Sequence, residues 1–135
     1  MELGYAEIAY APTIASSTSA LITGLELADI VVDGKPLLFT FTCPQGVEST
    51  VDGDVLGITL VRDSTPVKSV VARVGAGEVS FWSGVPFRDD PADGTYDYSL
   101  WWARLSGSGT CRINYTGSPF NCLPGLRCED IEVAP

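Results

Sequence analysis

The chain of 135 residues contains no histidine. The missing imidazole excludes a Ser-His-Asp triad, a Cys-His dyad and a metal site with imidazole ligands. Basic residues are also scarce, because 8 Lys and Arg stand against 17 Asp and Glu, giving a formal net charge of −9. Such a charge repels phosphate backbones, so the composition argues against nucleic acid or an anionic membrane surface as a partner.

Long apolar runs are missing as well. No stretch approaches the roughly 18 uninterrupted apolar residues of a membrane-spanning helix, and residues 1–10 lack the basic start of a signal peptide. We therefore expect synthesis in the cytosol, with release by a route such as lysis of a host cell. Yet 45% of the residues are hydrophobic and only 19% are charged. This balance is apolar for a solitary soluble domain, and we expect a partner to cover some of its surface.

What the sequence does contain is a series of short segments rich in Val, Ile, Thr, Phe and Tyr, punctuated by fourteen glycines and nine prolines. Such segments predict strands and no helix longer than about two turns. The predicted strands lie near residues 3–10, 18–23, 25–32, 36–43, 55–62, 66–74, 77–83, 95–105, 109–115 and 126–133. Prolines cannot donate to a ladder and are expected between the strands, at Pro12, Pro44, Pro66, Pro86 and Pro91.

Alternating side chains over residues 37–43 and 55–61 are typical of half-buried antiparallel sheets. We therefore predict one all-β domain over residues 1–135, a two-sheet antiparallel β-sandwich with jelly-roll topology. Residues 1–20 are expected to form an extended N-terminal arm or an edge strand.

One predicted strand, residues 95–105, carries aromatic side chains on both faces. Tyr96, Tyr98 and Trp102 share one face, whereas Trp101 must point to the other, because successive side chains alternate across a strand. A single core buries only one of these faces, so the other face is covered by a surface loop or by a neighbouring subunit. We favour the subunit and predict Tyr96, Tyr98, Trp101 and Trp102 as oligomer-interface residues.

The chain has four cysteines, Cys43, Cys111, Cys122 and Cys128. No two of them are separated by only two to four residues, the spacing that is typical of zinc sites. Cys43 continues an apolar strand face and is expected to be a buried thiol. For Cys111, Cys122 and Cys128, a disulfide formed after release and free thiols are equal alternatives. The acidic stretch 88–94 lacks the ligand spacing of a calcium loop and is interpreted as a solvated turn. We predict no metal, no cofactor and no catalytic site.

Five short segments follow one another along the chain: Leu3-Gly-Tyr-Ala-Glu7, Val32-Asp-Gly-Lys-Pro-Leu-Leu-Phe39, Gly57-Ile-Thr-Leu-Val-Arg-Asp63, Asp93-Gly-Thr-Tyr-Asp-Tyr-Ser-Leu100 and Leu123-Pro-Gly-Leu-Arg-Cys-Glu-Asp-Ile131. Their order resembles the small jelly-roll virion structural proteins of tailed bacteriophages, especially those infecting actinobacteria. It is also similar to the trimeric C1q/TNF-like jelly roll, which has a late Gly-x-Tyr-x-Tyr strand. The resemblance covers most of the chain, and the tail from Cys111 to Cys128 departs from it.

The resemblance implies a non-enzymatic virion protein that decorates and stabilises the capsid on the particle exterior. Its expected partners are further copies of itself, in a homotrimer, and the major capsid protein or other virion proteins. The alternative is a minor tail or fibre head domain that binds a host receptor or a cell-surface carbohydrate. In that case Trp82, Trp101 and Tyr115 would form a platform on which sugars stack.

Overall fold

Ten strands make up the fold, and the computed structural model describes residues 1–77 and 79–131, with the backbone alone for residues 80–83. The strands are β1 (Glu2–Glu7), β2 (Thr13–Ile14), β3 (Ala20–Val32), β4 (Leu37–Ser49), β5 (Asp54–Arg62), β6 (Thr65–Val74), β7 (Ser80–Asp89), β8 (Gly94–Ser106), β9 (Cys111–Ile113) and β10 (Gly125–Asp130). No described residue is helical, and this part of the chain holds no helix able to cross a membrane.

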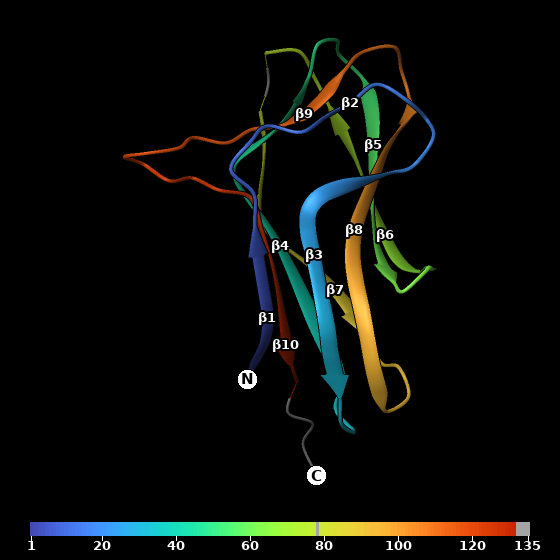
Figure 1. Cartoon of the computed structure of the whole chain (residues 1–135). Helices are drawn as coiled ribbons and strands as arrows, with labels where there is room; N and C mark the ends of the chain where they lie inside the picture. Colours follow the sequence, from blue (N-terminus) through green and yellow to red (C-terminus); the bar gives the residue numbers. More distant parts are fainter. Residues whose placement is uncertain (78, 132–135) are drawn as a thin grey trace.

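The strands form two antiparallel sheets that face each other (Figure 1). Sheet A contains β1, β10, β4 and β7, with the short strands β9 and β2 beside the far end of β4. Sheet B has the order β3-β8-β5-β6. Four nested ladders join β1 to β10, β3 to β8, β4 to β7 and β5 to β6. Nested pairing of this kind is jelly-roll topology, so the predicted fold is confirmed.

The core lies between the inner faces of the two sheets. Phe39 and Phe41 enter it from sheet A, and Leu56, Ile58 and Leu60 enter it from sheet B, all of them fully buried. The alternation over residues 37–43 and 55–61 therefore does mark the buried faces. Burial of each such side chain contributes about 1.5–3 kcal/mol to folding, which makes this double layer the main source of stability.

Three of the prolines expected between strands lie within strands. Pro44 sits in β4 where its ladder with β7 shifts register between Cys43 and Val47, so no ladder hydrogen bond is required of it. Pro66 and Pro86 belong to β6 and β7, which are edge strands. An edge strand tolerates proline because one side of its backbone has no partner strand. Prolines mark edges and irregularities here as well as turns.

The two strands expected at 18–23 and 25–32 form one continuous strand, β3. Gly24 adopts a φ of 97°, and the ladder with β8 shifts register between Leu21 and Glu26. The glycine thus interrupts the pairing without ending the strand. The N-terminal segment supplies β1, an edge strand of sheet A paired with β10, which is one of its two predicted forms.

Candidate interaction surface on sheet B

The adjacent indoles of β8 point to opposite faces of sheet B, as the strand period requires. Trp102 belongs to the core and is 2% exposed. Trp101 is half-buried on the outer face, where it pairs with Leu21 of β3 on one side and Thr59 of β5 on the other. Its indole Nε1 donates a hydrogen bond to Ser99 Oγ at 2.9 Å. With its N–H satisfied, the ring presents an apolar surface to solvent.

The prediction that Tyr98 and Trp102 lie at a subunit interface is wrong. Tyr98 is 1% exposed, and its ring lies 4.3 Å from that of Phe39 inside the sandwich. Side chains enclosed by their own subunit offer a neighbour nothing to contact. Tyr96 is half-buried against the core, and its hydroxyl donates to the carbonyl of Ala92 at 2.7 Å. Of the four candidates, only Trp101 faces outward, and its place in an interface stays a prediction.

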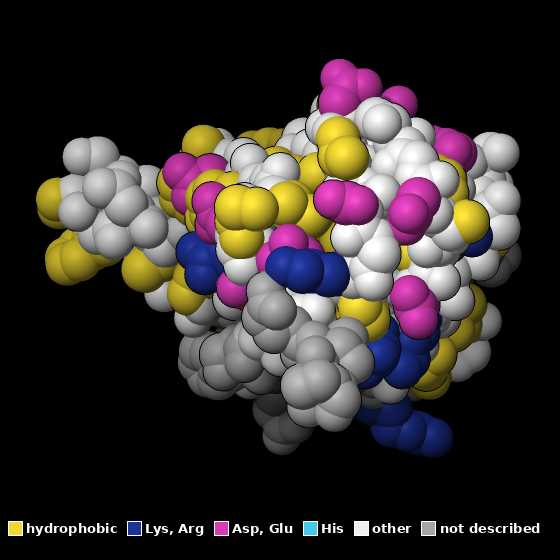
Figure 2. Space-filling view, turned by 90° about the horizontal axis from the view of Figure 1, so that it is seen from below, with side chains coloured by type: hydrophobic (Ala, Val, Ile, Leu, Met, Phe, Trp, Pro, Cys, Tyr) yellow, Lys and Arg dark blue, Asp and Glu magenta, His cyan; other side chains and the backbone are white. Residues whose placement is uncertain are grey.

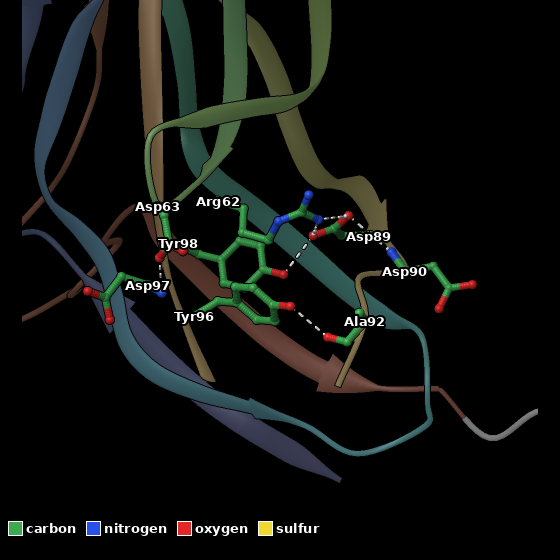
Figure 3. Close-up of polar contacts among 8 residues, drawn as sticks. All are labelled: Arg62, Asp63, Asp89, Asp90, Ala92, Tyr96, Asp97 and Tyr98. Atoms are coloured by element: carbon green, nitrogen blue, oxygen red, sulfur yellow. Dashed lines mark hydrogen bonds and ion pairs between the residues drawn. The ribbon is translucent and has the colours of Figure 1, made fainter. Parts of the chain in front are cut away.

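Tyr98 instead completes a polar cluster at one end of the sandwich (Figure 3). Asp89, which is 7% exposed, accepts hydrogen bonds from Arg62 Nη1 at 2.7 and 2.8 Å and from the Tyr98 hydroxyl at 2.6 Å. Burial, and then the bond to Asp89, raise the pKa of Tyr98. The hydrogen bond to Asp89 likewise raises the pKa of the Arg62 guanidinium, which lies 5.6 Å from the centre of the Tyr96 ring. The stretch 88–94 is therefore not wholly a solvated turn, because Asp89 is an internal partner of the core.

A shallow depression surrounds Trp101 on the outer face of sheet B. Its volume is about 510 Å³, larger than that of the other depressions described, the next of which has about 320 Å³. We call it the Trp101 depression, and the residues lining it are Ser19, Thr59, Val61, Asp63, Ser64, Pro66, Ser69 and Trp101. Its floor combines an indole, a proline and a valine with a rim of hydroxyl groups and one carboxylate.

Apolar surface continues beyond the depression along the outer face of sheet B. Val61 and Ala103 lie on this face but are themselves buried, at 8% and 6% exposed, and they stand outside the cluster of side chains between the sheets. Leu105, which is 50% exposed, lies over Gly57, where a Cβ atom would come within 2.9 Å of a leucine methyl carbon. The exposed apolar surface of this face therefore centres on Trp101 and Leu105, and such a surface is suited to contact with a partner.

All four cysteines, each among the described residues, are free thiols. Cys43 is fully buried, as expected, and its thiol contacts the carbonyl oxygen of Gly46 at 3.1 Å. Of the possible disulfides among Cys111, Cys122 and Cys128, the strand pairing excludes the one between Cys111 and Cys128. Cys128 pairs with Phe39 and Cys111 with Ser49, so these two lie ten β4 positions apart, about 30 Å at the rise of a strand. A disulfide needs Cα atoms within about 7 Å. Burial raises the pKa of Cys43 and of Cys128 to about 12.

A second buried carboxylate, Asp54, is one that sequence analysis missed. It is fully buried and accepts hydrogen bonds from Ser49 Oγ at 2.6 Å and from the backbone amides of Ser108 and Gly109 at 3.1 Å each. It thereby ties the β4–β5 connection to the β8–β9 turn. Its signal in the sequence, Asp52-Gly-Asp54, does not distinguish an exposed turn residue from a buried one. In the described ranges, 1–77 and 79–131, no group of three His, Cys, Asp or Glu could hold a metal ion.

The aromatic residues of the alternative sugar platform are not brought together. Trp101 lies on the outer face of sheet B, whereas Tyr115 belongs to the loop between β9 and β10 of sheet A. The side chain of Trp82 lies outside the described residues. Of the proposed platform, the part of the fold that the structure describes therefore provides only Trp101, together with the hydroxyl groups around its depression.

No family model matches the chain, and no curated protein matches it significantly. One similar solved structure is the insecticidal delta-endotoxin Cry8Ea1 from Bacillus thuringiensis, with 14% sequence identity and a TM-score of 0.46. The match covers 90% of this chain but only 20% of the endotoxin chain. The chain thus spans about a fifth of the length of that neighbour, and the likeness carries no functional argument.

Proposed function

We propose that the chain is a non-enzymatic virion structural protein, a capsid decoration protein of a tailed bacteriophage. It assembles as a homotrimer in the host cytoplasm and sits on the outside of the particle, bound to the major capsid protein. Jelly rolls are a common architecture of viral capsid domains, although the fold by itself supports many functions. The observation that carries the proposal is Trp101, a half-buried indole in a depression on the outer face of sheet B.

The physical reason is the free energy of burying that face. The part of the Trp101 indole that faces water forgoes some hydrophobic stabilisation, and a closed cyclic interface recovers it. A trimer also matches the local three-fold positions of an icosahedral lattice. Three weak contacts with the shell then act together through their high effective concentration.

The test compares Trp101→Gln with Val31→Gln, a matched control on the exposed end of β3. Val31 is 59% exposed and does not line the Trp101 depression. We expect light scattering to give about three times the 14.3 kDa chain mass for the wild type and the control, and one chain mass for Trp101→Gln. Occupancy on purified capsids should fall together with the mass. Far-ultraviolet circular dichroism checks that the variant is folded, and a monomeric wild type absent from particles would refute the proposal.

A second candidate function is saccharide binding by a tail or fibre head domain. It is favoured by the hydroxyl groups of Ser19, Thr59 and Ser69 around the Trp101 ring, because sugar sites combine an aromatic face with a polar rim. Thr59 and Ser69 already hydrogen-bond each other at 2.6 Å. Calorimetric titration with host cell-wall saccharides separates the two functions, since a decoration protein binds capsids and gives no heat with the sugars.

A further inference from the structure

The loop between β9 and β10, residues 114–124, forms a hairpin that stands out from the sandwich (Figure 1). Thr116 and Cys122 exchange two backbone hydrogen bonds, of 3.2 and 2.7 Å, across its base. At its end, the amides of Phe120 and Asn121 both donate to the carbonyl of Gly117, at 3.0 and 2.9 Å. The hairpin therefore has a defined shape of its own and presents its tip away from the body of the protein.

The tip of this hairpin is apolar and uncharged. Phe120 is 76% exposed, more than any other large hydrophobic side chain described except Met1. Residues 114–124 contain no Asp, Glu, Lys or Arg. In Figure 2 the hairpin is the projection at the left, with hydrophobic side chains at its end. An exposed phenylalanine on a hydrogen-bonded support is suited to insertion into a partner.

The Trp101 depression has the complementary character. Trp101, Val61 and Pro66 supply its apolar part, and a volume of about 510 Å³ leaves room for an aromatic side chain. The depression opens on the outer face of sheet B, which points away from sheet A, whereas the hairpin connects two strands of sheet A. Phe120 therefore does not reach the depression of its own chain, and a second copy must bring the two together.

Charge also favours a second copy as the occupant. Each chain carries a formal charge of −9, so two copies repel each other over most of their surfaces. A contact between copies forms where both sides are nearly free of acidic groups. The hairpin has no charged residue, and among the residues that the structure describes Asp63 is the one charged residue lining the depression.

We propose that Phe120 of one copy inserts into the Trp101 depression of the next copy. This inference rests on the proposed homotrimer and specifies the segment that contacts Trp101. The contact joins two different surfaces, so it is head-to-tail, and three such contacts close a ring in which every hairpin and every depression is occupied. An isologous contact between two Trp101 faces would leave the hairpins free.

The test uses two variants, each of which loses one half of the contact. Phe120→Ser keeps the depression, and Trp101→Gln keeps the hairpin. Sedimentation velocity should give one chain mass for each variant alone, while the control Val31→Ser keeps the wild-type mass. In a mixture of the two variants, the intact hairpin of Trp101→Gln can enter the intact depression of Phe120→Ser. Each pair of unlike chains therefore has one complete contact. At concentrations well above those at which the wild type assembles, the mixture should form dimers, and closed rings should be absent.

The possible outcomes separate this inference from the proposed function. If Phe120→Ser leaves the wild-type oligomer intact, the hairpin is not the occupant and the inference fails, while the homotrimer stands. If both variants are monomeric but their mixture forms no dimer, the two sites do not touch each other and the inference also fails. A monomeric wild type refutes the homotrimer itself. If that monomer binds a saccharide and Trp101→Gln does not, the occupant of the depression is a sugar. Circular dichroism of each variant shows whether a chain that sediments as a monomer is still folded.

Discussion

At the scale of single residues, two buried carboxylates hold the ends of the jelly roll together. Asp54 accepts two backbone amides and a serine hydroxyl, and Asp89 accepts an arginine and a tyrosine hydroxyl. A buried carboxylate is stable only when its oxygens are hydrogen-bonded, because desolvation of an unpaired charge is very unfavourable. Both residues therefore make the fold sensitive to changes in their neighbours.

The turn that contacts Asp54 has little room for a side chain. Gly107 has a φ of 104°, and a Cβ atom there would lie 1.8 Å from Asp54 Oδ1. Gly53 has a similar φ of 81°, but a Cβ atom would meet nothing within 4 Å. We expect Gly53→Ala to lower the free energy of unfolding by about 1–2 kcal/mol, the cost of a left-handed backbone. Gly107→Ala should lower it by clearly more, because the alanine also displaces the carboxylate. Urea denaturation measures both, and equal losses would contradict this account of Asp54.

The two tyrosines of β8 provide another matched comparison. The Tyr98 hydroxyl donates to buried Asp89, whereas the Tyr96 hydroxyl donates to the carbonyl of Ala92 at the surface. Tyr98→Phe leaves a buried carboxylate with one donor fewer and should destabilise the protein by about 1–3 kcal/mol. Tyr96→Phe should lower the free energy of unfolding by less than about 1 kcal/mol, since water replaces its hydroxyl. If the two variants unfold at the same urea concentration, the Asp89 cluster does not contribute as the geometry indicates.

At the scale of strands, the sequence predicts the elements well and their limits less well. The period-two alternation on β4, β5 and β8 identifies their buried faces because each strand has one face on the core. Proline alone does not tell a turn from an edge strand, and Pro66 and Pro86 lie in edge strands. Gly24 indicates a break but does not tell a bulge from a strand end. Whether Asp89 is buried depends on Arg62, a residue distant in sequence that no local pattern pairs with it.

The strands also set the reactivity of the cysteines. Cys43, Cys111 and Cys128 lie on inward faces of β4, β9 and β10 and are fully buried, whereas Cys122 is half-buried in the hairpin. Thiolate formation and access both govern reaction with thiol reagents. We expect Ellman's reagent to label one thiol per native chain, none in Cys122→Ser, and four in denaturant. Rapid labelling of two or more thiols in native wild-type protein would contradict the burial of these strands.

Burial of thiols predicts a loss of stability in alkaline solution. The folded pKa values of Cys43 and Cys128, about 12, lie above the unfolded value, which is about 8.5. The contribution of these two protonated thiols to the free energy of unfolding is therefore fully present below about pH 8.5 and is lost as the pH rises towards 12. The loss is up to about 1.4 kcal/mol per pH unit for each thiol. The Cys43→Ala, Cys128→Ala double variant should be less stable at neutral pH, with a shallower decline between about pH 8.5 and 10. Urea titrations at a series of pH values measure the free energy of unfolding of the wild type and of the double variant. If the two values fall in parallel as the pH rises, the buried thiols are not the cause of the decline.

At the scale of the whole molecule, sequence and structure contribute different parts of the candidate site. The presence of two adjacent tryptophans predicts that one of them faces outward, because strand geometry leaves no other arrangement. Which of the two does so depends on the position of the core, and the structure assigns this role to Trp101. The Trp101 depression and the projecting Phe120 come from segments distant in sequence. Neither was foreseen, although the uncharged stretch 114–124 is visible in the sequence.

Net charge leads to the last prediction, which concerns the response of the assembly to salt. Acidic side chains are spread over the surface, as the lower end in Figure 2 illustrates, and each chain carries −9. Copies therefore repel one another at low ionic strength. The proposed contact between Phe120 and the Trp101 depression contains almost no charge to be screened. Raising the salt from about 0.01 to 0.15 M shortens the Debye length from about 30 to 8 Å and screens mainly the repulsion.

Association should therefore strengthen with salt over this range and persist at higher concentrations. Sedimentation equilibrium at a series of sodium chloride concentrations measures this, with Phe120→Ser as the control that stays monomeric throughout. Dissociation by salt would mean that ion pairs between subunits hold the oligomer. The contact would then have to involve the basic residues of the chain, such as Arg88 or Arg73, rather than the uncharged hairpin and the Trp101 depression.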